Sequence, residues 1–297
     1  MKFRLALAVL FVALGHGRAA ADDRRVSVGL LDMGGTPTAA RVAERLSRLM
    51  SSLKIKGATL ALHDRGMSAA AARGVGYAGS LNLTLAEARA LGAALGCDFF
   101  LTGDAQTVRR SSSARPVYFE SYASVFVVST RSGRLVHWDR PAAEADTAEA
   151  AEASLLAKLE GAAQLYAGVV MIEDEREERE RFAVNEGEPA AVIDLSTDEG
   201  AASNKDLREP APYRRLRPAY TDAAARAEAE ATVDALVEIG ADGEVAGVRV
   251  VRWAGFGLDE EVVATVRRMR FRPAQREGEP VPVRVLLRYN FRKPPKS

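Results

Sequence analysis

The chain has 297 residues and a formal net charge of +1, with 41 Lys and Arg against 40 Asp and Glu. This length suffices for about two domains of ordinary size. The balanced charge gives no overall reason to expect nucleic acid as a partner. One cysteine and three histidines are too few for a His/Cys zinc cluster, so we expect neither a metal nor a cofactor.

The first 21 residues have the order of a secretory signal peptide. Lys2 and Arg4 precede an apolar stretch at residues 5–15, and small residues at 19–21 follow. The apolar stretch is shorter than the ~20 residues that a membrane-spanning helix needs, and we expect no later stretch to come closer to that length. Cleavage after about Ala21 would therefore release a soluble periplasmic protein. Retention of residues 1–21 as an inner-membrane anchor is the alternative.

Residues 24–171 predict an α/β domain with a mixed sheet. Strands are expected at residues 26–33, 59–63, 99–103, 117–130 and 135–138, and the last two should form a hairpin. Thr36 and Pro37 fit the start of a helix. Thr84 and Glu87 form a capping box for a helix that ends at Gly96. A further helix from about residue 144 carries an apolar stripe that would cover the sheet.

Two segments of this half resemble a known type of envelope domain. Residues 85–103 read LAEARALGAALGCDFFLTG, and residues 125–136 read VFVVSTRSGRLV. Together they resemble the domain shared by TolB amino-terminal regions, curli-secretion proteins and activators of penicillin-binding proteins. The resemblance covers about residues 26–170. It implies a module that binds other envelope proteins and carries no catalytic residues.

Several residues that could carry chemistry have a simpler interpretation. The G-x-G-x-x-G pattern at residues 74–79 follows an Ala-rich segment instead of a strand, so a surface loop is favoured over a dinucleotide site. His63 and His137 each lie next to or near an aspartate, but the sequence places no nucleophile beside them. Hydrogen-bonded histidines at strand ends are favoured over a hydrolase, and Cys97 should be a buried structural thiol.

Residues 172–217 differ in composition from both flanking regions. Glu175 with Arg179 and Glu177 with Arg181 have the i,i+4 spacing of a solvated helical extension. Residues 185–218 then lack periodicity and are rich in Gly, Pro and charge, as is typical of a flexible linker. The apolar spot at residues 192–195 could dock on either domain or on a partner.

The region from residue 218 to 292 predicts a small ββαβ domain. Alternation at residues 232–239 and 244–252 around a turn at 241–243 indicates a hairpin. Residues 258–269 form a helical stripe with acidic residues in the first turn and basic residues in the last. Residues 281–289 alternate again as the final strand, and residues 293–297 are a tail. The whole chain is therefore expected to be α+β.

This region is similar to the TonB carboxy-terminal domain family. The motifs that carry the resemblance occur in the family's order, and they are PAY at 218–220, DGEV at 242–245, GLD at 257–259, MRFRPA at 269–274 and EGEPVPV at 277–283. The chain departs from the family pattern at Thr221, Ala231 and Met269. The resemblance implies a non-enzymatic domain that binds an extended peptide, the TonB box of an outer-membrane transporter, beside its last strand.

Strand addition would place the partner along residues 281–289, because an unpaired strand edge offers free backbone donors and acceptors. The candidate partner-binding residues are Val281, Val283, Arg284, Val285, Leu287, Arg288 and Tyr220. We expect Val285→Pro to abolish peptide capture by removing a backbone donor. A solvated edge protected by its arginines is the alternative.

Residues 267–297 contain ten Lys and Arg against two Asp and Glu, which would favour an acidic peptide or envelope polymer. The leading hypothesis is thus a non-enzymatic periplasmic adaptor without catalytic residues, and its oligomeric state is left open. It would bind an outer-membrane transporter or another envelope protein, with no nucleic acid and with membrane contact only through that partner or a retained signal segment. A membrane-anchored energy transducer for outer-membrane transport and, last, a hydrolase are the alternatives.

Overall fold

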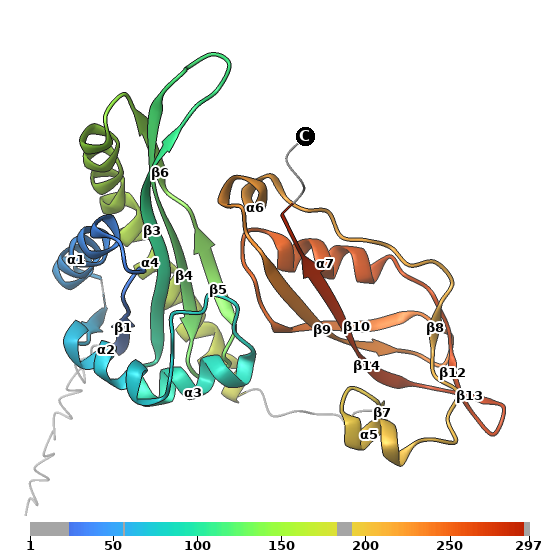
Figure 1. Ribbon diagram of the computed structural model, residues 1–297. Coiled ribbons are helices and arrows are strands. Elements are labelled where there is room, and N and C mark those ends of the chain that lie inside the picture. Colours follow the sequence, from blue (N-terminus) through green and yellow to red (C-terminus); the bar gives the residue numbers. More distant parts are fainter. Residues whose placement is uncertain (1–23, 56, 183–191, 294–297) are drawn as a thin grey trace, which may run out of the picture.

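The computed structural model describes residues 24–55, 57–182 and 192–293, so the expected signal peptide lies outside the described residues. The described residues form two units, each with its own sheet, lying side by side (Figure 1). Helices and sheets occur in both units, which confirms the α+β class.

The amino-terminal unit is built on a mixed sheet, as predicted. Its strands are β1 (Arg24–Leu30), β2 (Ala58–Leu62), β3 (Phe99–Arg110), β4 (Tyr118–Ser129), β5 (Leu135–Asp139) and β6 (Ala142–Ala145). The order is β2-β1-β3-β4-β5, and β6 pairs with β4 beyond the end of β5. β1 runs parallel to β2 and β3, whereas β3, β4 and β5 are antiparallel. β3 is longer than expected, because its polar second half pairs with β4 as far as Arg110.

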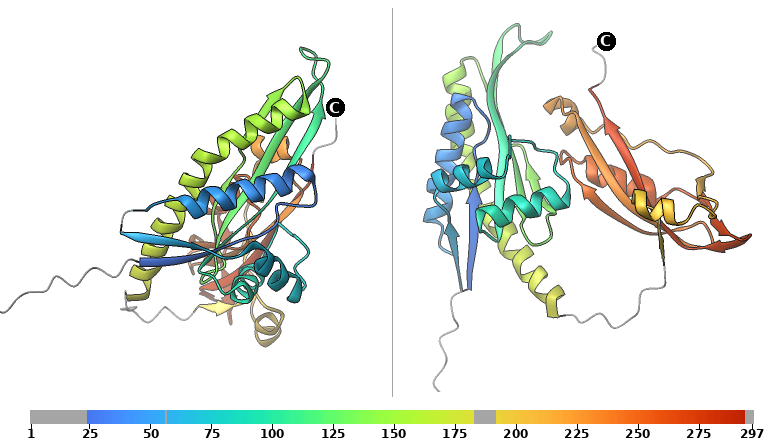
Figure 2. Two further views of the ribbon diagram at one scale, coloured as in Figure 1. Left: turned by 90° about the vertical axis from the view of Figure 1, so that its left-hand side faces the viewer. Right: turned by 60° about the horizontal axis from the view of Figure 1, so that its bottom comes forward.

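Helices cover both faces of this sheet (Figure 2). α1 (Pro37–Ser52) and α4 (Ala148–Phe182) pack on one face, and α2 (Arg65–Gly74) and α3 (Leu85–Leu95) lie on the other. The Thr36 side chain accepts a hydrogen bond from the backbone N–H of Ala39 and so caps α1. The predicted capping box of Thr84 and Glu87 is present, and α3 ends at Gly96 in the left-handed conformation.

α4 is a single helix that includes the predicted helical extension. By length and composition alone it could cross a membrane, which corrects the expectation that no later stretch approaches that size. Its apolar side chains instead pack against the sheet, where Leu155, Leu159 and Tyr166 are fully buried. α4 therefore behaves as the core helix of this unit.

The charged end of α4 is less solvated than its composition predicts. Glu173 and Glu177 are buried, and each has a polar partner. Arg134 forms an ion pair with Glu173 at 2.7 Å, and the Ser129 hydroxyl donates a hydrogen bond to Glu177 at 2.6 Å. The i,i+4 ion pair that forms here is between Arg176 and Glu180. These contacts bind the end of α4 to the turn between β4 and β5.

The carboxy-terminal unit has the predicted ββαβ order. It consists of β9 (Ala231–Ile239), β10 (Val245–Arg252), α7 (Leu258–Arg267) and β14 (Val283–Phe291), with the short strands β11 (Phe271–Arg272), β12 (Ala274–Arg276) and β13 (Glu279–Val281) between α7 and β14. The sheet order is β10-β9-β14-β7, and α7 packs on β9 and β10.

The described part of the expected flexible linker, from residue 192, instead packs on this sheet. It contains β7 (Ile193–Asp194), α5 (Asp198–Ser203) and β8 (Ala211–Pro212), and α6 (Asp222–Ala227) follows. β7 pairs with β14 and β8 pairs with β11. Backbone groups make these short pairings, so they require no alternation of apolar and polar residues. A prediction from hydrophobic periodicity therefore misses them.

The two units share a hydrophobic contact. Trp253 follows β10, and its ring lies 5.9 Å from that of Phe126 on β4, whereas Phe256 contacts both Phe126 and Trp138. Asn82, in the loop before α3, accepts a hydrogen bond from the backbone of Thr232 and donates to it in return. The units are therefore docked by both apolar and polar contacts.

Candidate functional site

The last strand, β14, has a free edge along most of its length. On one side it pairs with β9 from Val283 to Phe291. On the other side β7 pairs with Val283 and Arg284 only. Among the described residues no strand pairs with this second side beyond Arg284. The predicted edge therefore exists, but the chain itself occupies its first two positions.

Hydrogen bonds to β7 show which residues point their backbone at the free edge. The N–H of Leu195 donates to the carbonyl oxygen of Arg284 at 2.8 Å. The N–H and C=O of one strand residue point to the same side, and the side alternates along the strand. Leu286, Arg288 and Asn290 therefore direct their backbone groups outward. Val285 points toward β9, so Val285→Pro would break the internal ladder instead, which corrects our expectation.

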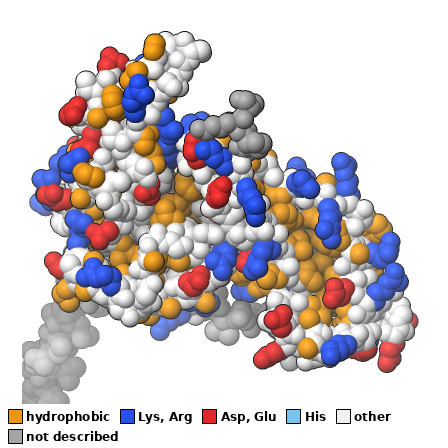
Figure 3. Space-filling model, viewed as in Figure 1, with side chains coloured by type: hydrophobic (Ala, Val, Ile, Leu, Met, Phe, Trp, Pro, Cys, Tyr) orange, Lys and Arg blue, Asp and Glu red, His pale blue; other side chains and the backbone are white. Residues whose placement is uncertain are grey.

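A groove of about 440 Å³ with both polar and apolar surface runs beside this edge. Its lining residues come from β14 and from the segments on either side of it. The apolar ones are Leu195, Pro210, Pro212, Leu216, Met269, Phe271, Val285, Leu286, Leu287 and Tyr289, and the charged ones are Glu209, Arg215 and Arg288. Figure 3 shows hydrophobic side chains on this unit with Lys and Arg side chains around them. The β14 side chains remain accessible here because α7 covers β9 and β10 instead.

The two predicted arginines of β14 already have partners. Arg284 forms ion pairs with Glu238 at 2.7 Å and with Asp194 at 3.3 Å. Arg288 forms an ion pair with the buried Asp234 at 2.7 Å. Their side chains alternate with Val285 and Leu287 along β14 and so point to the other sheet face, although Arg288 also lines the groove at this edge. Both arginines thus support the sheet, and their charge is largely compensated within it.

Other basic residues of the last thirty are also compensated. Arg270 pairs with Glu244, Arg276 with Asp206 and Lys293 with Glu228. The positive excess counted along the sequence is therefore reduced in the folded domain by acidic residues from earlier segments.

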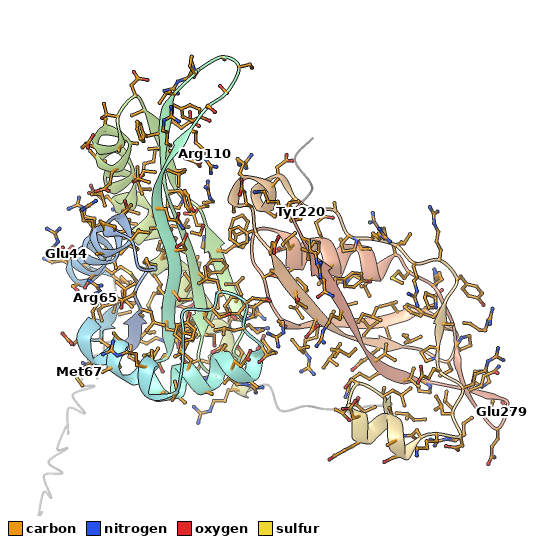
Figure 4. The ribbon with its side chains drawn as sticks, in the orientation of Figure 1. Glu44, Arg65, Met67, Arg110, Tyr220 and Glu279 are labelled. Atoms are coloured by element: carbon orange, nitrogen blue, oxygen red, sulfur yellow. The ribbon has the colours of Figure 1, made fainter. Side chains whose placement is uncertain are left out.

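Tyr220 supports the domain from the other end of β14 (Figure 4). Its hydroxyl donates to the carbonyl oxygens of Ala229, at 2.8 Å, and Ala224, at 3.1 Å. Its ring centroid lies 6.5 Å from that of Phe291. Tyr220 thus closes the turn around α6, and it does not line the groove.

Of the remaining predicted residues, Val285 and Leu287 line the groove. Val283 is fully buried in the core, and Val281 lies in β13, paired with Ala274. The opposite groove wall, at residues 209–216, was not foreseen. The closely spaced Pro210 and Pro212 were its only sequence signal, because prolines favour an extended backbone.

The side chains considered for catalysis contact neighbouring parts of the fold. Nδ1 of His63 lies 3.2 Å from the carbonyl oxygen of Leu95, and the His137 ring lies beside that of Tyr166. Cys97 is buried, and burial raises the pKa of its thiol to about 11. Among the described residues, no cluster of three His, Cys, Asp or Glu side chains could hold a metal ion.

Each of the similar solved structures matches only a part of the chain. A solution structure of the Pseudomonas aeruginosa TonB CTD is 21% identical, covers 36% of this chain and 100% of its own, and has a TM-score of 0.27. The hypothetical protein CT253 from Chlamydia trachomatis is 13% identical over 50% of this chain and 94% of its own, with a TM-score of 0.32. The PelC dodecamer from Paraburkholderia phytofirmans is 10% identical over 48% of this chain and 87% of its own, with a TM-score of 0.27.

No curated protein matches the chain. A family model does match the region that holds the groove. Residues 217–292 fit the family described as Gram-negative bacterial TonB protein C-terminal, so this part of the chain is a TonB carboxy-terminal domain.

Proposed function

We propose that the protein is a non-enzymatic envelope protein that captures an extended peptide from an outer-membrane or periplasmic protein. The peptide would add as a strand to the free edge of β14. The observation that carries this proposal is the unpaired edge after Arg284, which lies beside a groove lined by apolar and charged residues. The match to the TonB carboxy-terminal family supports an envelope role.

The edge and the groove would supply different parts of the recognition. The outward backbone groups of Leu286, Arg288 and Asn290 can pair with any extended chain, so they provide affinity. Alternate side chains of the bound peptide would enter the groove beside Leu287 and Tyr289, which favours apolar residues at every second position. Selectivity thus comes from the groove.

β7 limits where the partner strand can begin. Ile193 donates to the carbonyl oxygen of Pro282, and Leu195 donates to that of Arg284, so these two acceptors are already used. A partner that leaves β7 in place would pair from Leu286 onward. We therefore expect a short paired segment that continues the line of β7.

Peptide binding to the full chain tests this proposal. The probes are fluorescein-labelled dodecapeptides that cover the periplasmic amino-terminal segments of the source organism's outer-membrane transporters, followed by fluorescence anisotropy. Leu286→Pro removes an outward N–H and should weaken binding about tenfold or more. Leu286→Ala keeps the N–H and should bind within about threefold of the original chain.

Circular dichroism of each variant verifies that the sheet is intact. Wild-type affinity in a folded Leu286→Pro variant would contradict capture at this edge. So would a loss of binding that is equal for Leu286→Pro and Leu286→Ala, because only the proline removes the backbone donor.

We further propose a periplasmic location with the signal segment removed. Intact-mass and amino-terminal analysis of the native protein, after separation of periplasm and membranes, tests this directly. A chain that begins near Asp22 in the periplasmic fraction is the expected result. An intact Met1 in the inner-membrane fraction would favour the membrane-anchored energy transducer.

A further inference from the structure

A second groove, of about 550 Å³, lies between the two units. One wall is formed by residues 134–138 of the amino-terminal unit, and the other by residues 248–250 of β10 and by α7. This groove shares no lining residue with the groove beside β14. It is therefore a separate feature of the molecule.

Each wall includes the edge strand of a sheet. β5 is the last strand of the amino-terminal sheet, and β10 is the first strand of the carboxy-terminal sheet. Side chains of successive strand residues point to opposite faces. Consecutive residues of both strands line the groove, so the backbone edge of each strand faces it.

Hydrogen-bond alternation identifies the free backbone groups on these edges. The N–H of Ser129 on β4 donates toward β5, to the carbonyl oxygen of Arg134 at 3.0 Å, so Val127, two residues earlier, also bonds toward β5. Its partner His137 therefore faces β4, and the residue after it, Trp138, points its N–H and C=O outward. Val237 of β9 bonds toward β14 through its pair with Val285, so its neighbour Leu236 bonds toward β10, where it pairs with Arg249. Val248 and Val250 therefore point outward from β10.

The chain itself shows that the β10 edge accepts a strand. Just beyond Val250, Thr84 forms an antiparallel bridge with Arg252, and the N–H of Trp253 donates to the carbonyl oxygen of Leu83 at 3.1 Å. Leu85 then begins α3 and turns away, and it lines one end of the groove. The edge beside Val248 and Val250 is left without a strand among the described residues.

The side chains define the chemistry of an occupant. The groove surface is mainly apolar, with contributions from Leu135, Trp138, Val263 and Ala264. Arg249 and Arg267 lie on it and are exposed, and no ion pair involves either of them within the described part of the chain. One exposed acidic residue, Glu260, accompanies them. An apolar strand that ends in carboxylates complements this arrangement.

We propose that this groove is a second peptide-binding site, which takes an extended apolar segment with an acidic end from a partner protein. The segment lies between β5 and β10 and bonds to their outward backbone groups. Because both units contribute a wall, occupancy also fixes the arrangement of the two units. The site does not depend on capture at β14.

The test uses the full chain and a labelled octapeptide of alternating Val and Thr that ends in two Asp residues. Ala264 is exposed on the groove wall, so Ala264→Trp should fill the groove and weaken binding about tenfold or more. Ala246→Trp is the matched control, because Ala246 is exposed on β10 outside the groove. A peptide with two Lys in place of the two Asp should bind more weakly.

Backbone amide shifts separate this site from the first. Binding should move the amide signals of Trp138, Val248 and Val250, and it should persist in Leu286→Pro. The proposal is overturned if the octapeptide does not bind, if Ala264→Trp and Ala246→Trp bind it equally, or if only β14 amides respond. Failure of capture at β14 would leave these results unchanged, so the two proposals fail separately.

Discussion

The indole nitrogen of Trp253 donates a hydrogen bond to the carbonyl oxygen of Gly133, at 3.1 Å, and this bond joins the carboxy-terminal unit to the β4–β5 turn of the amino-terminal unit. Trp253 is 2% exposed, so neither group can turn to water instead. The same ring stacks on Phe126. Trp253 thus contributes both an apolar contact and a hydrogen bond to the docking of the two units.

Trp253→Phe should separate these two roles. Phenylalanine keeps most of the apolar contact but leaves the Gly133 carbonyl without its donor, which costs about 1–3 kcal/mol for a buried group. Urea unfolding followed by circular dichroism measures this loss. Tyr213→Phe is the control, because Tyr213 is 69% exposed and its change should have little effect. An equal stability of both variants would show that the indole hydrogen bond does not contribute.

Gly255 lies at the same contact and offers a sharper test. Its φ is +72°, and a Cβ there would lie 2.5 Å from Cε1 of Phe126. Gly255→Ala should therefore both strain the backbone and force the units apart. Gly257 has a similar φ of +75°, but its Cβ would meet only Thr221, at 3.4 Å. Gly257→Ala is thus a control for strain alone.

Small-angle scattering distinguishes the two glycine variants. Gly255→Ala should increase the radius of gyration, whereas Gly257→Ala should lower stability without changing it. An unchanged radius of gyration in a folded Gly255→Ala protein would contradict the role of this contact in docking.

Features set by local sequence patterns could be predicted from the sequence, whereas features set by long-range contacts could not. Strands and helices with clear periods were predicted well, as the capping box of Thr84 and Glu87 illustrates. The TonB-type motifs also identified the last strand correctly. The contacts of Trp253 were not predictable, because they join residues 120 positions apart that no local pattern connects.

The candidate site was predicted only in part for the same reason. Alternation placed Val285 and Leu287 together, but it could not show that Arg284 and Arg288 bind acidic residues of β9. Nor could it show that β7 occupies the first positions of the edge, since two paired residues leave no periodic trace. Long-range pairing, which the sequence does not encode locally, decides these features.

Asp234 should make the carboxy-terminal sheet sensitive to acid. Burial alone would raise the pKa of Asp234, but hydrogen bonds and charge from Arg288 and Arg252 hold it below its usual value. Because the pKa is lower in the folded state, the carboxylate stabilises the fold above about pH 4, and this contribution is lost as the pH falls through the folded-state value.

Asp234→Asn removes that contribution at every pH. We expect it to cost about 1–3 kcal/mol at neutral pH, a range that allows for the solvent exposure of Arg288. Between pH 5 and pH 3 the variant should lose less stability than the original chain in urea unfolding. Equal losses in both proteins would assign the acid sensitivity to other groups.

The anchoring of β7 is a separate prediction. The Asp194 carboxylate accepts hydrogen bonds from the Ser196 backbone N–H and hydroxyl, and it forms an ion pair with Arg284. Asp194→Asn weakens both, so the amide of Leu195 should exchange with deuterium faster, whereas the amides that join β9 and β14 should not change. Asp198→Asn is the control, because Asp198 lies in the first turn of α5. Unchanged exchange at Leu195 would show that backbone pairing alone holds β7.

Asp259 should make the stability of the loop between β10 and α7, which contacts the amino-terminal unit, depend on pH near neutrality. Its carboxylate accepts hydrogen bonds from the backbone N–H groups of Ala254, at 2.9 Å, and Gly255, at 2.7 Å. Burial raises the pKa of Asp259 to about 7, although these two hydrogen bonds oppose the rise. The folded state therefore holds a proton that the unfolded chain, with a pKa of about 3.9, releases earlier.

Since the folded-state pKa is raised, the free energy of unfolding should fall as the pH rises from about 4 to above 7, by on the order of 3–4 kcal/mol. Asp259→Asn cannot ionise and should remove this slope, although it can accept only one of the two hydrogen bonds. The carboxyl carbon signal of Asp259 measures the titration directly. Glu260→Gln removes the neighbouring negative charge and should lower the pKa of Asp259. Titration of Asp259 near pH 4 in the original chain would contradict this prediction.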